Sequence, residues 1–196
     1  CTVRNNTLSA IRKASGGNHN QSGITLYGVS NALIEHNRIF DAGAGVFFKN
    51  TGSSSLQSGN IVRFNLISDV GEAIAYSLVS AGSTGRNWIF QNIAYDVNHG
   101  VRILDATDDW IFNNTFYNLG IACLSLDDDA GGSIFWGNIC HTSTQYMITA
   151  EGVDMPTAAV MDLQHQVYYT YATFYTGTDG NRTFAGYLAA FADLDE

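Results

Sequence analysis

Four side chains at related places in successive repeats could together support chemistry on a carboxylated substrate. They are Lys49, Glu72, His99 and Arg102. A Lys or His side chain can act as a general base, and an Arg side chain can hold a carboxylate through paired hydrogen bonds. β-Elimination from a uronate needs both functions, one to remove the proton at C5 and one to neutralise the carboxylate. The alternative is a solvated surface of mixed charge, where such residues usually lie.

A second group consists of acidic residues in two loops at equivalent places in consecutive repeats. These are Asp105, Asp108 and Asp109 in one loop and Asp127, Asp128 and Asp129 in the next. Stacked carboxylates repel each other, and a Ca²⁺ ion with oxygen ligands would relieve that repulsion. We expect this ion at Asp105, Asp127 and Asp128, where it could also bridge an acidic sugar. A carboxylate pair could instead support glycoside hydrolysis, or the residues could be turn formers that end strands.

A short repeated pattern defines the elements that must position these residues. An apolar residue is followed three positions later by Asn and five positions later by another apolar residue, as in Ile34–Ile39 and Val62–Ile67. These marker Asn residues are Asn6, Asn37, Asn65, Asn92, Asn114 and Asn138, and a degraded seventh copy spans 162–167. Their spacings of 31, 28, 27, 22 and 24 indicate constant strands joined by variable loops. The local period of about 2 argues against a helical repeat.

A second strand follows each marker Asn at a fixed distance. Nine residues after the Asn come apolar residues, often preceded by Gly: Val46, Ile74, Val101, Cys123 and Met147. The outward positions ten residues after the Asn hold Phe47, Ala75, Arg102 and Leu124, and those twelve after hold Lys49, Ser77, Leu104 and Leu126. Tyr27 of the first coil belongs to the same column, and Glu72 and His99 come seven residues after their Asn. The four candidate residues therefore share one surface across three adjacent coils.

Stacking of successive coils would bury the apolar faces that the repeat creates. One coil cannot bury its own apolar face, so strands of successive coils must pair at about 4.8 Å. The Asn-centred motif with its Gly-Ile or Gly-Val strand resembles the repeat of pectate-lyase-like parallel β-helix proteins, over roughly residues 1 to 170. The resemblance implies an all-β, right-handed single-stranded parallel β-helix of about seven coils with a ladder of stacked Asn side chains.

The resemblance also implies a carbohydrate-active protein whose substrate lies along the strand after the Gly. The catalytic set expected there is Lys49, His99 and Arg102, and the substrate-binding set is Tyr27, Phe47 and Glu72. The expected function is action on an acidic polysaccharide, as a lyase or a glycoside hydrolase. The alternative is a non-catalytic module that binds glycan or spaces other domains. The class implies a secreted or cell-surface protein, of bacterial origin.

The composition of the chain argues against some classes of binding partner. The 196-residue chain carries a net charge of −9 without a Lys/Arg cluster, which argues against nucleic acid. The same charge means that an acidic polysaccharide needs a local basic pocket or a bound cation. No apolar run approaches the roughly 20 residues that span a bilayer, so no membrane partner is expected. Cys123 and Cys140 fall at inward positions, where we expect inert thiols rather than a disulfide.

The β-helix is expected over residues 1–169. Residues 170–196 break the repeat and are predicted to form a cap or flap with a short helix over 184–192. Outward positions before the marker Asn form an aromatic stripe too apolar to leave in water: Trp88, Phe90, Trp110, Phe112 and Trp136. The cap, a missing domain or a stacked sugar could cover this stripe, and we expect the cap. Because the chain opens on Cys1 in mid-pattern, a further domain or subunit could adjoin the N-terminal end.

Overall fold

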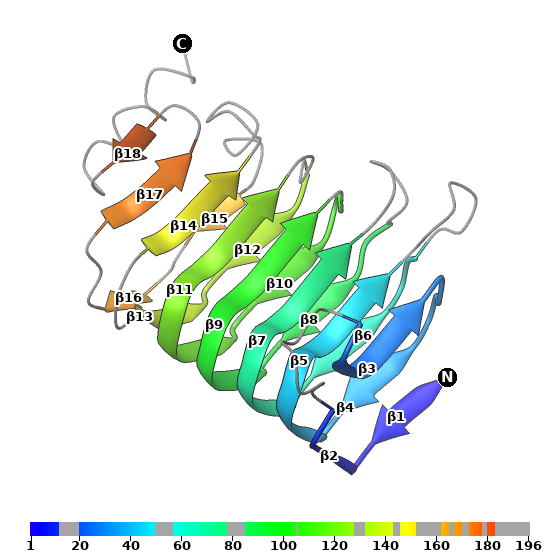
Figure 1. Cartoon of the computed structure of the whole chain (residues 1–196). Coiled ribbons are helices and arrows are strands. Elements are labelled where there is room, and N and C mark those ends of the chain that lie inside the picture. Colours follow the sequence, from blue (N-terminus) through cyan, green and yellow to red (C-terminus); the bar gives the residue numbers. More distant parts are fainter. Residues whose placement is uncertain are drawn as a thin grey trace.

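The computed structural model describes residues 1–11, 20–49, 57–77, 85–104, 106–127, 132–142, 146–151, 162–164, 167–169, 173–177 and 180–182. Every regular element in these ranges is a β-strand. No helix within them is long and apolar enough to cross a membrane. The strands wind into a solenoid whose coils stack from the blue N-terminal end to the orange strands in Figure 1. The predicted all-β parallel β-helix is therefore confirmed.

One sheet, here sheet A, consists of the three-residue strands that precede the marker Asn residues. Its seven strands follow chain order: β1 (Thr2–Arg4), β4 (Leu33–Glu35), β6 (Ile61–Arg63), β8 (Trp88–Phe90), β10 (Trp110–Phe112), β12 (Ile134–Trp136) and β15 (Asp162–Gln164). All neighbours in it are parallel. The middle residues of the central strands, such as Ile34, Val62 and Ile89, are fully buried, as period-2 alternation requires.

The other sheet, sheet B, holds the long strands and faces the viewer in Figure 1. Its main path comprises β2 (Thr7–Leu8), β5 (Arg38–Lys49), β7 (Leu66–Ser77), β9 (Ile93–Leu104), β11 (Thr115–Asp127), β14 (Tyr146–Glu151), β17 (Thr173–Gly177) and β18 (Gly180–Arg182). Beside this path lie β3 (Ser22–Tyr27), β13 (Ile139–Thr142) and β16 (Val167–Tyr169). The four central coils carry one strand of 12 or 13 residues each, whereas the coils at either end are split. Only the β17–β18 pair is antiparallel among these described strands.

The coils turn where the backbone adopts positive φ. The residue before each marker Asn has φ between 53° and 63°: Asn5, His36, Phe64, Gln91, Asn113 and Gly137. A second corner, four residues after the marker Asn, uses Asp41, Asp69, Asp96 and Asn118. Asn, Asp and Gly tolerate this left-handed region best, which accounts for Asn5, Asn113 and Gly137 at the first corner and for the Asp and Asn residues at the second, whereas the first corner also holds His36, Phe64 and Gln91 in the same conformation. At Gly137 a Cβ would also meet Asn113 Oδ1 at 2.6 Å, so a larger residue there would have to shift the Asn113 side chain.

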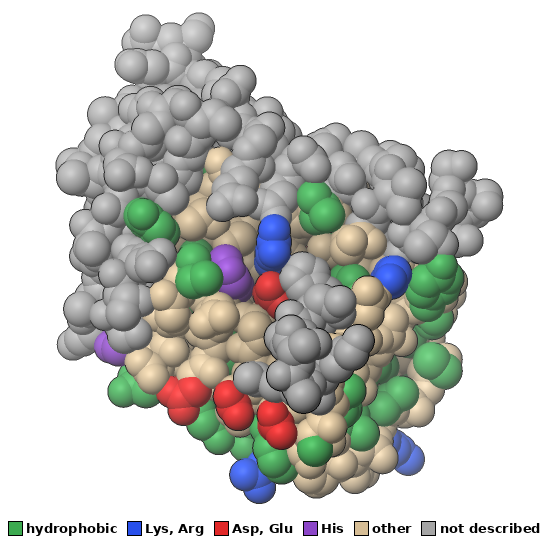
Figure 2. All heavy atoms as spheres, viewed as in Figure 1, with side chains coloured by type: hydrophobic (Ala, Val, Ile, Leu, Met, Phe, Trp, Pro, Cys, Tyr) green, Lys and Arg blue, Asp and Glu red, His purple; other side chains and the backbone are tan. Residues whose placement is uncertain are grey.

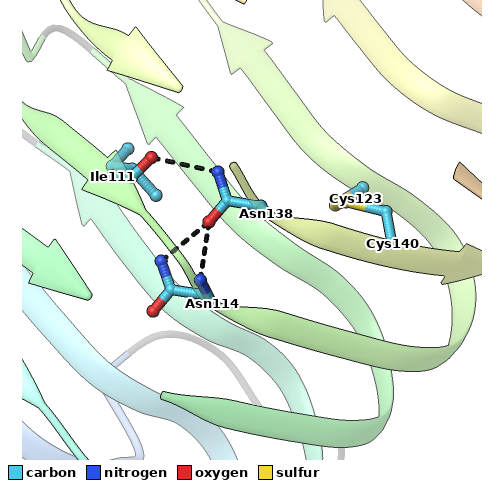
Figure 3. The surroundings of a disulfide bond; sticks show 5 residues. All are labelled: Ile111, Asn114, Cys123, Asn138 and Cys140. Carbon is cyan, nitrogen blue, oxygen red and sulfur yellow. Dashed lines mark hydrogen bonds between the residues drawn. A yellow bond between two sulfur atoms is a disulfide. The ribbon is translucent and has the colours of Figure 1, made fainter. Parts of the chain in front are cut away.

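The marker Asn residues form the ladder that the resemblance implied. The side-chain oxygen of each Asn accepts hydrogen bonds from the backbone N–H and the Nδ2 of the Asn one coil earlier, at 2.9–3.1 Å. From Asn37 onward, each amide also donates to a carbonyl of the preceding coil, as Asn138 does to Ile111 at 3.0 Å (Figure 3). From Asn37 to Asn138 these side chains are at most 2% exposed, so the ladder satisfies polar groups inside the solenoid.

A second ladder, which the sequence pattern did not indicate, lies five residues before the marker Asn residues. Its members are Asn60, Asn87, Asp109 and Ser133. Asn60 donates to Asn87 Oδ1 through N and Nδ2 at 3.1 and 2.9 Å, and Asn87 donates in the same way to Asp109 Oδ1 at 2.9 and 2.8 Å. The Asp109 N–H then donates to Ser133 Oγ at 3.3 Å. Asp109, grouped with the acidic loop residues on sequence grounds, is therefore fully buried.

The predicted register of sheet B is wrong beyond β9. Ser125 pairs with Arg102 and Leu124 with Val101, because the β9–β11 pairing shifts between Leu119 and Ala122. One extra residue in β11 therefore turns Leu124 inward and places Ser125 in the outward column. Leu124 and Leu126, predicted to point outward, are 0% and 1% exposed.

The expectation of inert thiols is also wrong. Cys123 and Cys140 form a disulfide between β11 and β13 (Figure 3). Their Cα atoms lie 5.9 Å apart in adjacent coils, which is within the range that a disulfide can bridge. Their predicted inward placement is correct, since both residues are at most 1% exposed.

The aromatic stripe lies on the outer face of sheet A. Trp88 pairs with Trp110, and Phe90 pairs with Phe112, whose ring it stacks against at 4.9 Å with an interplanar angle of 9°. Because the Phe90 and Phe112 rings face each other along the stack, they present edges to the surroundings. The predicted helix over 184–192 lies outside the described residues. The described strands of the C-terminal segment, β17 and β18, continue sheet B.

Candidate functional site

Three of the predicted site residues lie together on the outer face of sheet B. His99 and Arg102 are three residues apart on β9, and Glu72 on β7 is the register partner of His99. Arg102 Nη1 lies 3.8 Å from Glu72 Oε1, and their side chains are 31% and 10% exposed. Figure 2 shows basic, acidic and His side chains adjoining one another near the middle of this face. A cation, a carboxylate and an imidazole are therefore combined on one surface.

Two hydroxyl groups extend this cluster. His99 Nδ1 lies 2.6 Å from Ser125 Oγ, and Thr149 Oγ1 donates to Ser125 Oγ at 2.6 Å. Ser125 and Thr149 are 2% and 7% exposed. Sequence reasoning missed both residues, because the extra residue in β11 moves the outward column by one position. Their spacing of 24 residues, which equals the Asn114–Asn138 spacing, was the available signal.

The other predicted site residues lie nearer the N-terminus, Phe47 and Lys49 on β5 and Tyr27 on β3. Lys49 pairs in register with Tyr27 on one side and with Ser77 of β7 on the other. Ala75 of β7 pairs with Arg102, so the β7 strand lies between Lys49 and the strand that carries Arg102. Lys49 Nζ donates to Asn20 Oδ1 and lies 5.9 Å from the centre of the Phe47 ring. Tyr27 is 54% exposed.

Phe47 is covered in this structure. Its side chain is 2% exposed and belongs to a small buried cluster with Ala44 and Ala75, outside the main core. A sugar that stacked on Phe47 would therefore have to displace the groups that cover it. The structure groups Glu72, His99 and Arg102, and it places Lys49, Phe47 and Tyr27 in a neighbouring group.

Of the three residues predicted to bind a cation, only Asp127 lies within the described ranges. Asp105 and Asp128 lie outside the described residues, and Asp127 is the last residue of β11, whose backbone pairs with Leu104 and Glu151. Within the described ranges, no group of three His, Cys, Asp or Glu side chains is placed to hold a metal ion.

The stacked parallel coils, the two internal ladders and the polar cluster on sheet B define a parallel β-helix protein with a candidate site on its long-strand face. The family model described as "Periplasmic copper-binding protein (NosD)" matches residues 1–148, and the chain belongs to this family. No curated protein and no solved structure gave a significant match. The family is described as periplasmic, and this is consistent with an extracytoplasmic location.

The family description raises the question of a copper site. Copper in proteins is bound mainly by thiolate, thioether and imidazole groups. The described cysteines of the β-helix interior, Cys123 and Cys140, are joined in a disulfide, and Met147 is fully buried. The free thiol of the described residues is the exposed Cys1, and no group of three His, Cys, Asp or Glu side chains within the described ranges is placed to hold a metal ion.

Proposed function

We propose that the chain recognises an acidic polysaccharide outside the cytoplasm, through the outer face of sheet B around Glu72, His99 and Arg102. The observation that carries the proposal is the placement of the Arg102 guanidinium and the His99 imidazole on one face of β9. Guanidinium recognises carboxylates through paired hydrogen bonds, and imidazole can add a further donor. In a chain of net charge −9, an anionic ligand needs a local positive group, and the Arg102 guanidinium, which also contacts Glu72, supplies one here.

An extracytoplasmic location supports this choice of ligand. Disulfides persist in oxidising compartments such as the periplasm, and Cys123–Cys140 is a buried disulfide. The family description points to the same compartment. A polysaccharide is a ligand available there, and a row of stacked coils offers it a repeating surface.

Two forms of the function are open to experiment. In the catalytic form the protein is a polysaccharide lyase or glycoside hydrolase, with Lys49 or His99 as base and Arg102 on the carboxylate. In the other form it is a non-catalytic module that binds glycan or spaces other domains. We also propose that Ca²⁺ at Asp105, Asp127 and Asp128 assists binding by bridging to carboxylates of the sugar.

A polymer panel tests the proposal. Polygalacturonate, alginate and a neutral glucan are offered with and without Ca²⁺, and binding is measured by affinity electrophoresis. Absorbance of unsaturated products and release of reducing ends separate lyase, hydrolase and binding module. We expect retardation by at least one uronate polymer and none by the neutral glucan. Equal migration in all three polymers would contradict the proposal.

A further inference from the structure

The hydroxyl groups beside His99 determine where its ring proton lies. A Ser hydroxyl has one proton and two lone pairs. Thr149 Oγ1 donates its proton to Ser125 Oγ and so occupies one lone pair of that oxygen. In the described part of the chain, the other side-chain contact of Ser125 is with His99 Nδ1 at 2.6 Å. Ser125 is 2% exposed, so its own proton needs an acceptor within the protein, and Nδ1 is in place to accept it.

The consequence concerns the imidazole tautomer. A neutral imidazole has one nitrogen that donates and one that accepts, and the partner of the first decides the role of the second. When Nδ1 accepts from Ser125, the ring proton lies on Nε2. In that state Nε2 donates and cannot take up a proton, and Nδ1 is already engaged by Ser125. The Thr149–Ser125–His99 chain therefore presents His99 as a donor.

We propose that Ser125 and Thr149 are positioning residues of the candidate site, which hold His99 in the Nε2-protonated tautomer so that it binds a ligand carboxylate as a donor alongside Arg102. This inference rests on the proposed function for its ligand, but its statement about the tautomer does not. It assigns His99 to binding rather than to general-base catalysis. Arg102 can take part although it contacts Glu72, because a guanidinium has five N–H donors.

The tautomer can be measured without any ligand. Protein labelled with ¹⁵N at its five His residues is examined by long-range ¹H–¹⁵N correlation at pH 8.5, well above the ordinary His pKa of about 6.5. His99→Gln identifies the signals of His99. We expect the Nε2-protonated pattern in the wild type and a mixture of tautomers in Ser125→Ala. Thr25→Val is the matched control, since Thr25 lies in the same outward column four coils earlier and should leave His99 unchanged.

Two results would overturn the tautomer assignment. One is a wild-type ring that carries its proton on Nδ1. The other is an unchanged tautomer in both Ser125→Ala and Thr149→Val, once circular dichroism has shown that these variants are folded.

Binding then tests the donor role. Trigalacturonate and a guluronate trimer are titrated calorimetrically into wild type, Ser125→Ala and Thr25→Val. We expect Ser125→Ala to weaken binding about fivefold to tenfold and Thr25→Val to leave it within twofold. A changed tautomer with unchanged affinity would overturn the donor role. If neither trimer binds the wild type, the proposed function and the donor role fail, while the tautomer result stands on its own.

Discussion

The two internal ladders hold the same coils together at neighbouring corners, but they are built from different residues. The marker ladder is Asn at every step from Asn6 to Asn138, and each step has the same pair of hydrogen bonds. The second ladder changes from Asn to Asp109 and then to Ser133, where a single bond of 3.3 Å remains. An amide both accepts and donates, whereas an ionised carboxylate only accepts, so the two ladders place different demands on the buried interior.

Asp109 shows the effect of a carboxylate at a position where the second ladder otherwise carries an amide. Its Oδ1 accepts two bonds from Asn87, whereas Oδ2 and the buried Tyr76 Oη make no hydrogen bond of good geometry in the described structure, although Asp109 and Tyr76 interact with each other. Burial raises the pKa of Asp109 to about 7, and the bonds from Asn87 oppose that rise only in part. Burial likewise raises the pKa of Tyr76 well above its usual value. The second ladder is therefore sensitive to pH, and the marker ladder is not.

The largest expected effect comes from breaking the marker ladder. Asn92→Ala removes the acceptor of Asn65 N and Nδ2 and the donor to the Val62 carbonyl, all in the interior. Leaving buried polar groups unsatisfied costs about 1–3 kcal/mol each, and we expect a total loss of about 3–5 kcal/mol. Urea denaturation measures this loss as a lower midpoint.

Gln91→Asn is the matched control for that variant. Gln91 is exposed and has a φ of 53°, which Asn adopts readily, so its stability should change by less than about 0.5 kcal/mol. A loss below about 1 kcal/mol in Asn92→Ala would show that the ladder contributes little.

The next effect is a gain in stability from restoring Asn to the second ladder. The folded protein holds the Asp109 proton more tightly than the unfolded chain, whose pKa is 3.8, so it binds more protons between about pH 4 and pH 7. This contribution to stability is present at low pH and is lost as pH rises through about 7. Asp109→Asn avoids the buried charge, and we expect it to be more stable than wild type by about 2–4 kcal/mol at pH 8.

The pH series supplies the check. The difference in unfolding free energy between Asp109→Asn and wild type should shrink towards zero at pH 4, while Asp69→Asn, which changes an exposed carboxylate on β7, should follow wild type throughout. A constant difference at every pH would show that ionisation of Asp109 is not the cause.

The smallest of the three stability effects should come from the covalent link between the fifth and sixth coils. Cys123 and Cys140 are 17 residues apart, and closing a loop of that size stabilises by about 3 kcal/mol in the chain-entropy model. We expect the double variant Cys123→Ala, Cys140→Ala to lose about 2–3 kcal/mol in urea denaturation. Mass spectrometry of unreduced, alkylated protein provides the direct control: it should find one free thiol, at Cys1, and detection of three would contradict the disulfide.

The ladders also show how much of the fold can be predicted from the sequence. Six identical Asn residues in a fixed apolar frame reveal the marker ladder, the strand before it and the stacking of coils. The second ladder is hidden, because its members share hydrogen-bonding capacity rather than residue type. The extra residue in β11 is hidden too, since Cys123 and Leu124 are both apolar and fit a period-2 pattern in either register.

The same limit governs the candidate site. Glu72, His99 and Arg102 follow their marker Asn residues at the regular distances, so the sequence brings them to one surface. Ser125 and Thr149 lie beyond the extra residue, so the regular offsets miss them. The disulfide depends on the same register and could not be inferred without it.

The most direct test of the central claim compares two arginines on the two outer faces. Arg102 is 3.8 Å from Glu72 on sheet B, whereas Arg63 on sheet A is held by Glu35 at 2.8 Å. Calorimetric titration with the uronate trimer that binds wild type most tightly is repeated with Arg102→Ala and with Arg63→Ala. Recognition through the sheet B site predicts at least a tenfold loss of affinity in Arg102→Ala and less than a twofold change in Arg63→Ala. Wild-type affinity in Arg102→Ala would contradict it.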